Sequence, residues 1–330
     1  MLKRLFYFLI VVLVFDSCAS ISDTRDVTQI NISNYRDHQI MCEDIFAQVD
    51  SMDLLSLEGC PMGQIKSACK DDSVLYLLDE VNSIFSFDLK TGKIKRRITS
   101  VGNAKNEYVS LDVICVKNGK LVALDMNSMA ILTFTGDLNF ENRYHINFPC
   151  LDIVPVNRGY LAFNINASEE KKSIVLLDDS FKEVKSFGDS DFGVDHLPSS
   201  KLFSQTDDGA CFISPKDDDV YEWKNDSLKL AYHLNMSDKN ISGTIHRNTI
   251  SFFKMNNLLI STFLSGKKVY FNFYRKDKSM AGSVKLSNGQ TFMPVFQDRN
   301  VLYSIQPTKY NQKMKTENGY RKEAVLVKCN

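Results

Sequence analysis

Short runs of Val, Ile, Leu, Phe and Tyr recur from Ile45 to the end of the chain, each bounded by Asp, Asn, Gly or Lys-Gly turns. Runs of this kind are typical of β-strands, and long amphipathic helical stretches are absent from the pattern. One segment recurs six times at intervals of 40 to 50 residues, each time after a polar turn. The copies are centred on Leu75, Leu121, Leu161, Cys211, Leu259 and Leu302.

Each copy is followed, after a polar gap, by a third run and usually by a fourth. A period of this length that holds four strands is the signature of a propeller blade. The sequence therefore predicts an all-β fold, a six-bladed β-propeller with four-stranded antiparallel blades. A pair of β-sandwiches with evenly spaced hairpins is the alternative, but the spacing is regular and no linker divides the chain.

The segment from Ile45 to Leu57 precedes the first blade and has no blade of its own. We expect it to pair with the sixth blade as its outer strand, because joining the two ends of the chain leaves no open sheet edge. The predicted propeller occupies residues 41–330.

Residues 1–17 have the pattern of a signal peptide. Lys3 and Arg4 precede an unbroken apolar run from Leu5 to Phe15. As a helix that run spans about 16 Å, at about 1.5 Å per residue, whereas a bilayer core is about 30 Å thick. A charged start followed by a short apolar stretch is typical of secretory signal peptides.

The residues Phe15-Asp16-Ser17-Cys18 resemble a bacterial lipobox, in which the Cys becomes the lipidated first residue. We therefore expect Cys18 to carry a lipid that holds the protein at the membrane. An ordinary signal peptide with an incidental Cys is the alternative. Residues 18–40 are polar after this Cys, which predicts a flexible tether from Ala19 to Ile40. The segment Ser20–Asp23 holds one acidic residue, which favours an outer-membrane lipoprotein facing the periplasm over one exposed at the surface.

Composition narrows the class of protein. The chain has 330 residues, with 40 basic and 40 acidic side chains and a hydrophobic fraction of 44%. Disorder requires low hydrophobicity or high net charge, and a general nucleic-acid binder usually carries a basic excess. We therefore expect a folded monomer without a nucleic-acid partner.

Seven cysteines remain apart from Cys18, and an odd number cannot all pair within one chain. No tight metal-ligand spacing is present, so a zinc site is not expected. Most of them lie in apolar strand-like runs, where Cys packs as a small hydrophobe. We expect buried thiols, with one disulfide, for example Cys60 with Cys69, as the alternative. The seven are Cys42, Cys60, Cys69, Cys115, Cys150, Cys211 and Cys329.

The stretch Gly92-Lys93-Ile94, together with the segment Val101–Tyr108, resembles the six-bladed β-propeller lipoproteins of the Bacteroidetes. Members of that family typically show a Gly-rich run that ends in Glu-Tyr at this point. This chain departs from the pattern, because the residues between Gly102 and Glu107 are Asn, Ala, Lys and Asn. The resemblance implies the propeller fold and a place in the cell envelope, but no settled activity.

In a propeller, the loops that join the outer strand of one blade to the inner strand of the next share a face with the loops between second and third strands. We call this the loop face. Loops from every blade converge there around the channel, which makes it the usual binding face. For Glu107 and Tyr108 we favour a structural alternative, in which Glu107 caps a turn and Tyr108 wedges between blades. The candidate ligand-binding residues are Asn103, Lys105, Glu107, Tyr108, His196, His246 and Arg247.

An acidic loop offers a candidate metal site. Asp189, Asp191 and Asp195 lie around Gly193 and could place hard oxygen ligands around Ca²⁺. The loop lacks the EF-hand spacing, and the alternative is a solvated acidic loop.

No motif of a catalytic nucleophile elbow, zinc protease, phosphate-binding loop or dinucleotide site is present, so no catalytic residue is assigned. The sequence favours an envelope-anchored propeller that binds a protein, glycan or small ligand through its loop face. One alternative is a propeller hydrolase or lyase that acts on an envelope glycan or ester, with or without Ca²⁺. A structural role in an assembly is the other.

Overall fold

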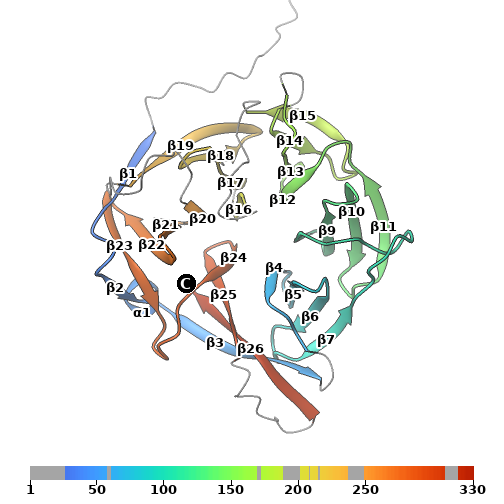
Figure 1. The fold of residues 1–330 in the computed structure, drawn as a ribbon, viewed down its shortest axis with the longest axis horizontal. Helices are drawn as coiled ribbons and strands as arrows, with labels where there is room; N and C mark the ends of the chain where they lie inside the picture. Colours follow the sequence, from blue (N-terminus) through green and yellow to red (C-terminus); the bar gives the residue numbers. More distant parts are fainter. Residues whose placement is uncertain are drawn as a thin grey trace, which may run out of the picture.

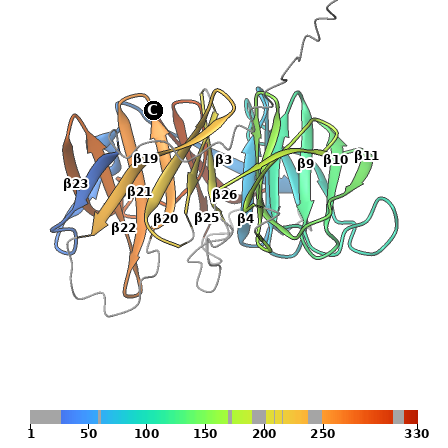
Figure 2. The same cartoon turned by 90° about the horizontal axis from the view of Figure 1, so that it is seen from above.

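The protein is a ring of six β-sheets around a central channel (Figure 1). The computed structural model describes residues 27–57, 61–168, 172–188, 201–207, 209–214, 216–236, 249–308 and 319–330. The blade strands run across the thickness of the ring, between its two faces (Figure 2). Within the described ranges, no helix is long and apolar enough to cross a bilayer.

Each blade has four antiparallel strands, which follow chain order from the channel outwards in the first five blades, whereas the sixth takes β3 as its outer strand. The inner strands are β4 (Ile65–Lys70), β8 (Val113–Lys117), β12 (Cys150–Val156), β16 (Phe203–Thr206), β20 (Thr249–Met255) and β24 (Pro294–Asp298). The second strands are β5 (Val74–Asp79), β9 (Lys120–Asp125), β13 (Gly159–Asn164), β17 (Gly209–Ile213), β21 (Leu258–Ser265) and β25 (Val301–Pro307). All six predicted repeat centres lie in these second strands, so the predicted fold class is confirmed.

The outer half of each blade completes the ring. The third strands are β6 (Ile84–Asp88), β10 (Ala130–Thr135), β14 (Ile174–Leu177), β18 (Asp219–Lys224), β22 (Lys268–Arg275) and β26 (Tyr320–Cys329). The outer strands are β7 (Ile94–Ile98), β11 (Phe140–His145), β15 (Glu183–Phe187), β19 (Ser227–Met236), β23 (Lys278–Lys285) and β3 (Val49–Leu57).

The hydrophobic core lies between the blades. Six clusters of buried side chains fill the six interfaces between neighbouring blades in the described part of the chain. Because both faces of a blade are covered, its middle strands are rich in apolar residues, and every residue of β5 and β13 is buried. The outer strand β7 is mostly half-buried or exposed and accordingly reads IKRRI.

Strand β3 closes the ring, as the sequence predicted. It pairs antiparallel with β26, from Val49 opposite Cys329 to Leu57 opposite Tyr320. The neighbouring blade approaches closely, because the Leu55 N–H donates to the carbonyl oxygen of Gly92 at 2.8 Å. Gly92 has a positive φ of 68°, and a Cβ there would lie 2.0 Å from the Asp53 carbonyl oxygen. A glycine is therefore required where β3 passes the first blade.

The prediction of a flexible tether is wrong for residues 27–40, the part of Ala19 to Ile40 that the structure describes. Strand β1 (Thr28–Ile32) adds in parallel to β19, and β2 (Gln39–Met41) adds in parallel to β23, at the rim of the ring (Figure 1). Ile30 and Ile32 alternate with polar residues and are buried. This pattern of two isoleucines was too short to stand out in a polar segment. The four-residue helix α1 (Cys42–Ile45) then leads into β3.

We expect Gly92→Ala to destabilise the protein more than Gly266→Ala does. Both glycines have a positive φ, but a Cβ at Gly266 would meet nothing within 4 Å. The shared conformational strain is about 1 to 2 kcal/mol, and displacing the Asp53 carbonyl adds about 1 to 3 kcal/mol at Gly92. Denaturant unfolding of the two variants measures the difference. Equal losses would contradict the close approach at the ring closure.

Candidate functional site

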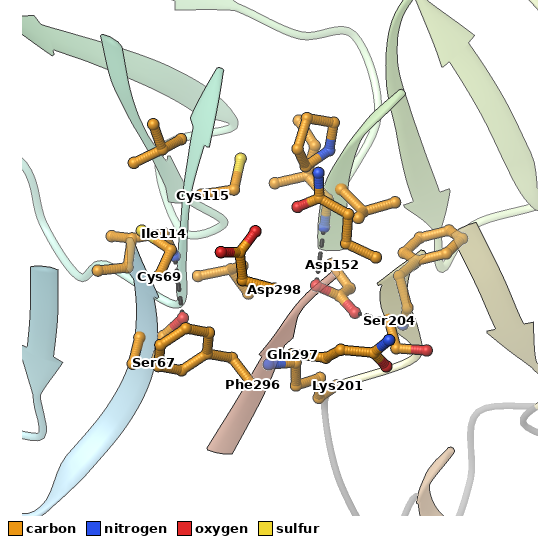
Figure 3. Close-up of a pocket in the computed structure, with 18 of the residues that line it drawn as sticks. Ser67, Cys69, Ile114, Cys115, Asp152, Lys201, Ser204, Phe296, Gln297 and Asp298 are labelled. Atoms are coloured by element: carbon orange, nitrogen blue, oxygen red, sulfur yellow. Dashed lines mark hydrogen bonds between the residues drawn. The ribbon is translucent and has the colours of Figure 1, made fainter. Parts of the chain in front are cut away.

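Polar side chains of the inner strands join neighbouring blades along the channel (Figure 3). The Ser67 hydroxyl on β4 accepts a hydrogen bond from the Ile114 N–H on β8 at 3.1 Å. On β24, the Gln297 side chain accepts from the Lys254 N–H and donates to the Lys254 carbonyl on β20. These bonds satisfy backbone groups that blade-to-blade packing would otherwise leave buried without a partner.

Asp152 makes the densest of these connections. One carboxylate oxygen accepts from the N–H groups of Leu202 and Phe203 at 2.6 and 2.8 Å, and the other accepts from the Ile153 N–H at 2.9 Å. Burial raises the pKa of this carboxyl to about 6, although the backbone hydrogen bonds and the nearby Lys201 act in the opposite direction. Asp152 thus fastens the third blade to the fourth.

The channel itself is narrow. Its cavity has a volume of about 70 Å³ and is lined from all six inner strands. Cys69 and Cys115 line it, and burial raises the pKa of both thiols. They therefore stay protonated near neutral pH, where a thiol is a poor nucleophile. Lys70, next to Cys69 in the lining, forms an ion pair with Asp298 at 2.5 Å. There is room for little more than water in the channel.

A larger cavity of about 740 Å³ opens on the loop face, where the first, fifth and sixth blades meet. Its position follows from its lining, which includes the first residues of β4, β20 and β24, the end of β25 and the start of β26. We call it the mouth cavity. Its apolar lining consists of Pro61, Met62, Ile65, Ile250, Phe253, Met293, Pro294, Val295, Ile305, Pro307 and Ala324.

Four cationic side chains, Lys66, Lys201, Arg321 and Lys322, also line the mouth cavity, with Glu323 as their acidic counterpart in its described lining. Lys66 lies 3.0 Å from Asp112, Arg321 lies 3.2 Å from Glu323, and Lys322 lies 2.5 Å from Asp53.

Lys201 occupies a different position, because it lines both the channel and the mouth cavity. Its ammonium group donates to the Val295 carbonyl oxygen at 2.6 Å. Burial lowers the pKa of Lys201, and the negative charge of Asp152 counteracts part of that effect. Lys201 therefore stands at the junction of the two cavities, beside an apolar wall.

The structure places Glu107 and Tyr108 in a turn before the second blade. A Glu107 carboxylate oxygen accepts from the Ala104 N–H at 2.8 Å. Tyr108 is fully buried between the first two blades, and its hydroxyl donates to the Asn82 carbonyl at 2.8 Å. These contacts agree with the structural alternative for both residues. Asn103 and Lys105 are exposed on the same turn, and none of the four residues lines either cavity.

The other predicted site residues lie outside the described part of the chain. They are the histidines and arginine of the loop face, the aspartates of the acidic loop and the lipidation site. Within the described ranges, no group of three or more His, Cys, Asp or Glu side chains could hold a metal ion. The residues concerned are His196, His246, Arg247, Asp189, Asp191, Asp195 and Cys18.

Sequence reasoning found the loop face but missed the side chains that line the cavity on it. Lys201 lies two residues before β16, and Ile250 is the second residue of β20. The first residues of each inner strand face the mouth of the channel, so their positions in the sequence could have predicted part of the lining. A single Lys or Phe at such a position carries no motif, however, and only the ring geometry brings Lys201 beside Val295.

Comparison with known proteins agrees with the architecture. Residues 20–297 match the family DUF5128, described as 6-bladed beta-propeller, and the chain belongs to this family. No curated protein sequence matches it.

Among solved structures, a Bacteroides fragilis NCTC 9343 protein named as an exported protein has a TM-score of 0.73 at 13% identity, over 92% of this chain and 99% of that one. A member of the duf4221 family from Bacteroides vulgatus ATCC 8482 has a TM-score of 0.46 at 9% identity, over 86% of this chain and 99% of that one. At 13% identity, the likeness to the Bacteroides fragilis protein shows the fold alone.

The raised pKa of Asp152 predicts a pH dependence of stability. In the unfolded chain an Asp titrates near 3.9, and in the folded protein Asp152 titrates at about 6. Between these values the folded state binds more protons, so the free energy of unfolding falls as pH rises from about 4 to 6. The loss is about 2 to 3 kcal/mol, and an Asp152→Asn variant should lack it. Urea unfolding at several pH values tests this, and parallel curves for the two proteins would contradict it.

Proposed function

We propose that this propeller is a binding module and that its ligand occupies the mouth cavity. The supporting observation is the cavity itself, which has a volume of about 740 Å³ on the loop face. Small-molecule sites usually measure about 300 to 1,000 Å³ and combine an apolar lining with a few polar groups. The 70 Å³ channel is too small for the same role.

The lining supports an amphipathic anion as the ligand class. Met62, Phe253 and Met293 offer an apolar wall, and burial of apolar ligand surface there contributes about 25 cal/mol per Å². Lys201 places a positive charge at the inner end of that wall. A carboxylate, sulfonate or phosphate on an apolar body would satisfy both features.

Binding is favoured over catalysis because of what Asp152 already does. A propeller hydrolase or lyase would need a carboxyl group that can move a proton on the substrate. Asp152 is a buried carboxyl with a raised pKa, as such a catalytic group would be. Its oxygens, however, already accept hydrogen bonds from three backbone N–H groups. Its oxygens are thus committed to holding the backbone, and burial alone accounts for its raised pKa.

Two naphthalene probes test the proposed site. 8-Anilinonaphthalene-1-sulfonate is an apolar anion, and N-phenyl-1-naphthylamine has the same ring system without charge. We expect both to bind the wild-type protein at one saturable site, and Met293→Ser to weaken both. Lys201→Met should raise the Kd of the anionic probe about tenfold, the loss of one charge-assisted hydrogen bond, and leave the neutral probe unchanged. Fluorescence titration measures all of these constants.

Lys229→Met is the matched control, because Lys229 is exposed on β19 and lines neither cavity. It should leave both constants at the wild-type value. Equal effects of Lys201→Met and Lys229→Met on the anionic probe would overturn the site. A similar loss for both probes in Lys201→Met would overturn the charge recognition.

We infer further that the protein is exported and held in the outer membrane, facing the periplasm, through a lipid on Cys18. The support is in the sequence, where Lys3 and Arg4 precede a short apolar run and Phe15-Asp16-Ser17-Cys18 resembles a lipobox. A single acyl chain binds membranes only weakly, and stable anchoring requires further acyl chains or a second signal.

The anchor predicts a simple labelling result. In cells fed with radiolabelled palmitate, the wild-type chain should carry the label and sediment with the outer membrane. Cys18→Ala should abolish the label, and Ser20→Ala should keep it. Incorporation of palmitate into the Cys18→Ala variant would rule out this residue as the lipid site.

A further inference from the structure

Two cysteines that are far apart in the sequence meet at the ring closure. Cys42 is the first residue of α1, and Cys329 is the last residue of β26. Their sulfur atoms lie 3.4 Å apart although 287 positions separate them in the chain. Both side chains are completely buried. The contact is therefore shielded from solvent, and neither cysteine lines the mouth cavity.

The backbone on both sides of the pair is fixed by hydrogen bonds. The Phe46 N–H donates to the Cys42 carbonyl at 3.1 Å, which closes the single turn of α1. The Ala47 N–H donates to the Asn330 carbonyl and the Asn330 N–H donates to the Gln48 carbonyl, both at 3.0 Å. The two sulfur atoms are thus held together by the same ladder that closes the ring.

The packing around the pair is tight and apolar. Cys42 and Cys329 belong to the cluster between the fifth and sixth blades, with Phe46, Phe271 and Leu302. The contact with the Cys42 thiol and the burial both raise the pKa of Cys329. In the closed ring, a thiol with a raised pKa inside an apolar cluster reacts slowly. If the two cysteines are oxidised, we therefore expect the reaction to occur during folding, before ring closure buries them.

We propose that Cys42 and Cys329 form a disulfide after export, which makes the ring closure covalent. The inference is independent of the ligand site and takes its oxidising compartment from the signal-peptide pattern. A disulfide bond is about 2.05 Å long, so the sulfur atoms must approach by about 1.4 Å, which side-chain rotation supplies.

The oxidant is a disulfide, carried by an envelope thiol oxidoreductase or by a small molecule. One cysteine thiolate attacks it, forms a mixed disulfide and releases one thiol of the oxidant. The second cysteine thiolate attacks the mixed disulfide, forms the Cys42–Cys329 bond and releases the second thiol. Two electrons pass to the oxidant, and the two protons lost from the cysteines end on its two thiols.

The disulfide would cross-link the ring at the seam where the start and the end of the propeller meet. Strand β3 is otherwise held to β26 by hydrogen bonds and side-chain packing. A cross-link spanning nearly the whole chain removes conformational freedom from the unfolded state, and this effect grows with loop length. The stabilisation should therefore appear in global unfolding.

Differential labelling maps the bond in the full chain recovered from the envelope. The protein is denatured in guanidinium with N-ethylmaleimide, then reduced, and then labelled with isotopically heavy N-ethylmaleimide. Cleavage after glutamate separates Cys42 from Cys60, because Glu43 and Glu58 lie between them. We expect Cys42 and Cys329 to carry the heavy label, and their two peptides to be joined before reduction. Light label on either residue, or a bond from either to another cysteine, overturns the proposal.

Stability measurements give a second readout. Wild-type protein that is unfolded, reduced and refolded under reductant should melt about 5 to 10 °C below the oxidised protein. Cys42→Ser should melt at one temperature in both preparations. Cys211→Ser, which changes an equally buried cysteine of the fourth blade, should keep the wild-type difference. Identical melting of oxidised and reduced wild type would contradict the covalent lock.

Discussion

The pairing of β3 with β26 is the interaction on which the rest of the structure depends. A blade buries both of its faces only if it has a neighbour on each side, and the first and sixth blades gain theirs when the ring closes. The register from Val49 to Leu57 also brings Leu54 into the interface between those blades, where it is fully buried. Because this strand comes from the start of the propeller and its partner from the end, the fold is complete only when both termini are in place. Long-range contacts of this kind are formed at a high cost in chain entropy.

The candidate site is a product of the same closure. The mouth cavity opens where the first, fifth and sixth blades meet, so the strands on both sides of the closing seam wall it. Deeper in the channel, the polar atoms of Ser67, Asp152 and Gln297 form hydrogen bonds with backbone groups of the adjacent blade. Side chains near the axis therefore divide into two groups. One group holds blades together, and the other, with Lys201 at the boundary, faces open space.

The fold was predictable because it is repeated. Six copies of one strand pattern give six independent observations of the same unit. The segment before the first copy had no blade of its own, so pairing with the sixth blade was its expected position. The added strands β1 and β2 were missed because Ile30, Ile32 and Ile40 are single apolar residues in a polar segment, and their burial comes from blades more than 190 positions away. The site was missed for a related reason. Glu107 and Tyr108 stand out in the sequence because a turn needs them, whereas Lys201 acquires its role from Val295 and Asp152, which belong to other blades.

Strand β1 also changes how far the molecule can move from a surface. If the chain from Cys18 to Met41 were fully extended and unpaired, it would span about 80 Å between the lipid site and the propeller, at about 3.5 Å per residue. Because β1 begins at Thr28, the ten positions from Cys18 to that strand can span at most about 35 Å. Strand β1 itself lies at the rim of the ring, beside β19 of the fourth blade (Figure 1). The lipid on Cys18 that we propose would therefore hold that rim within about 35 Å of the bilayer.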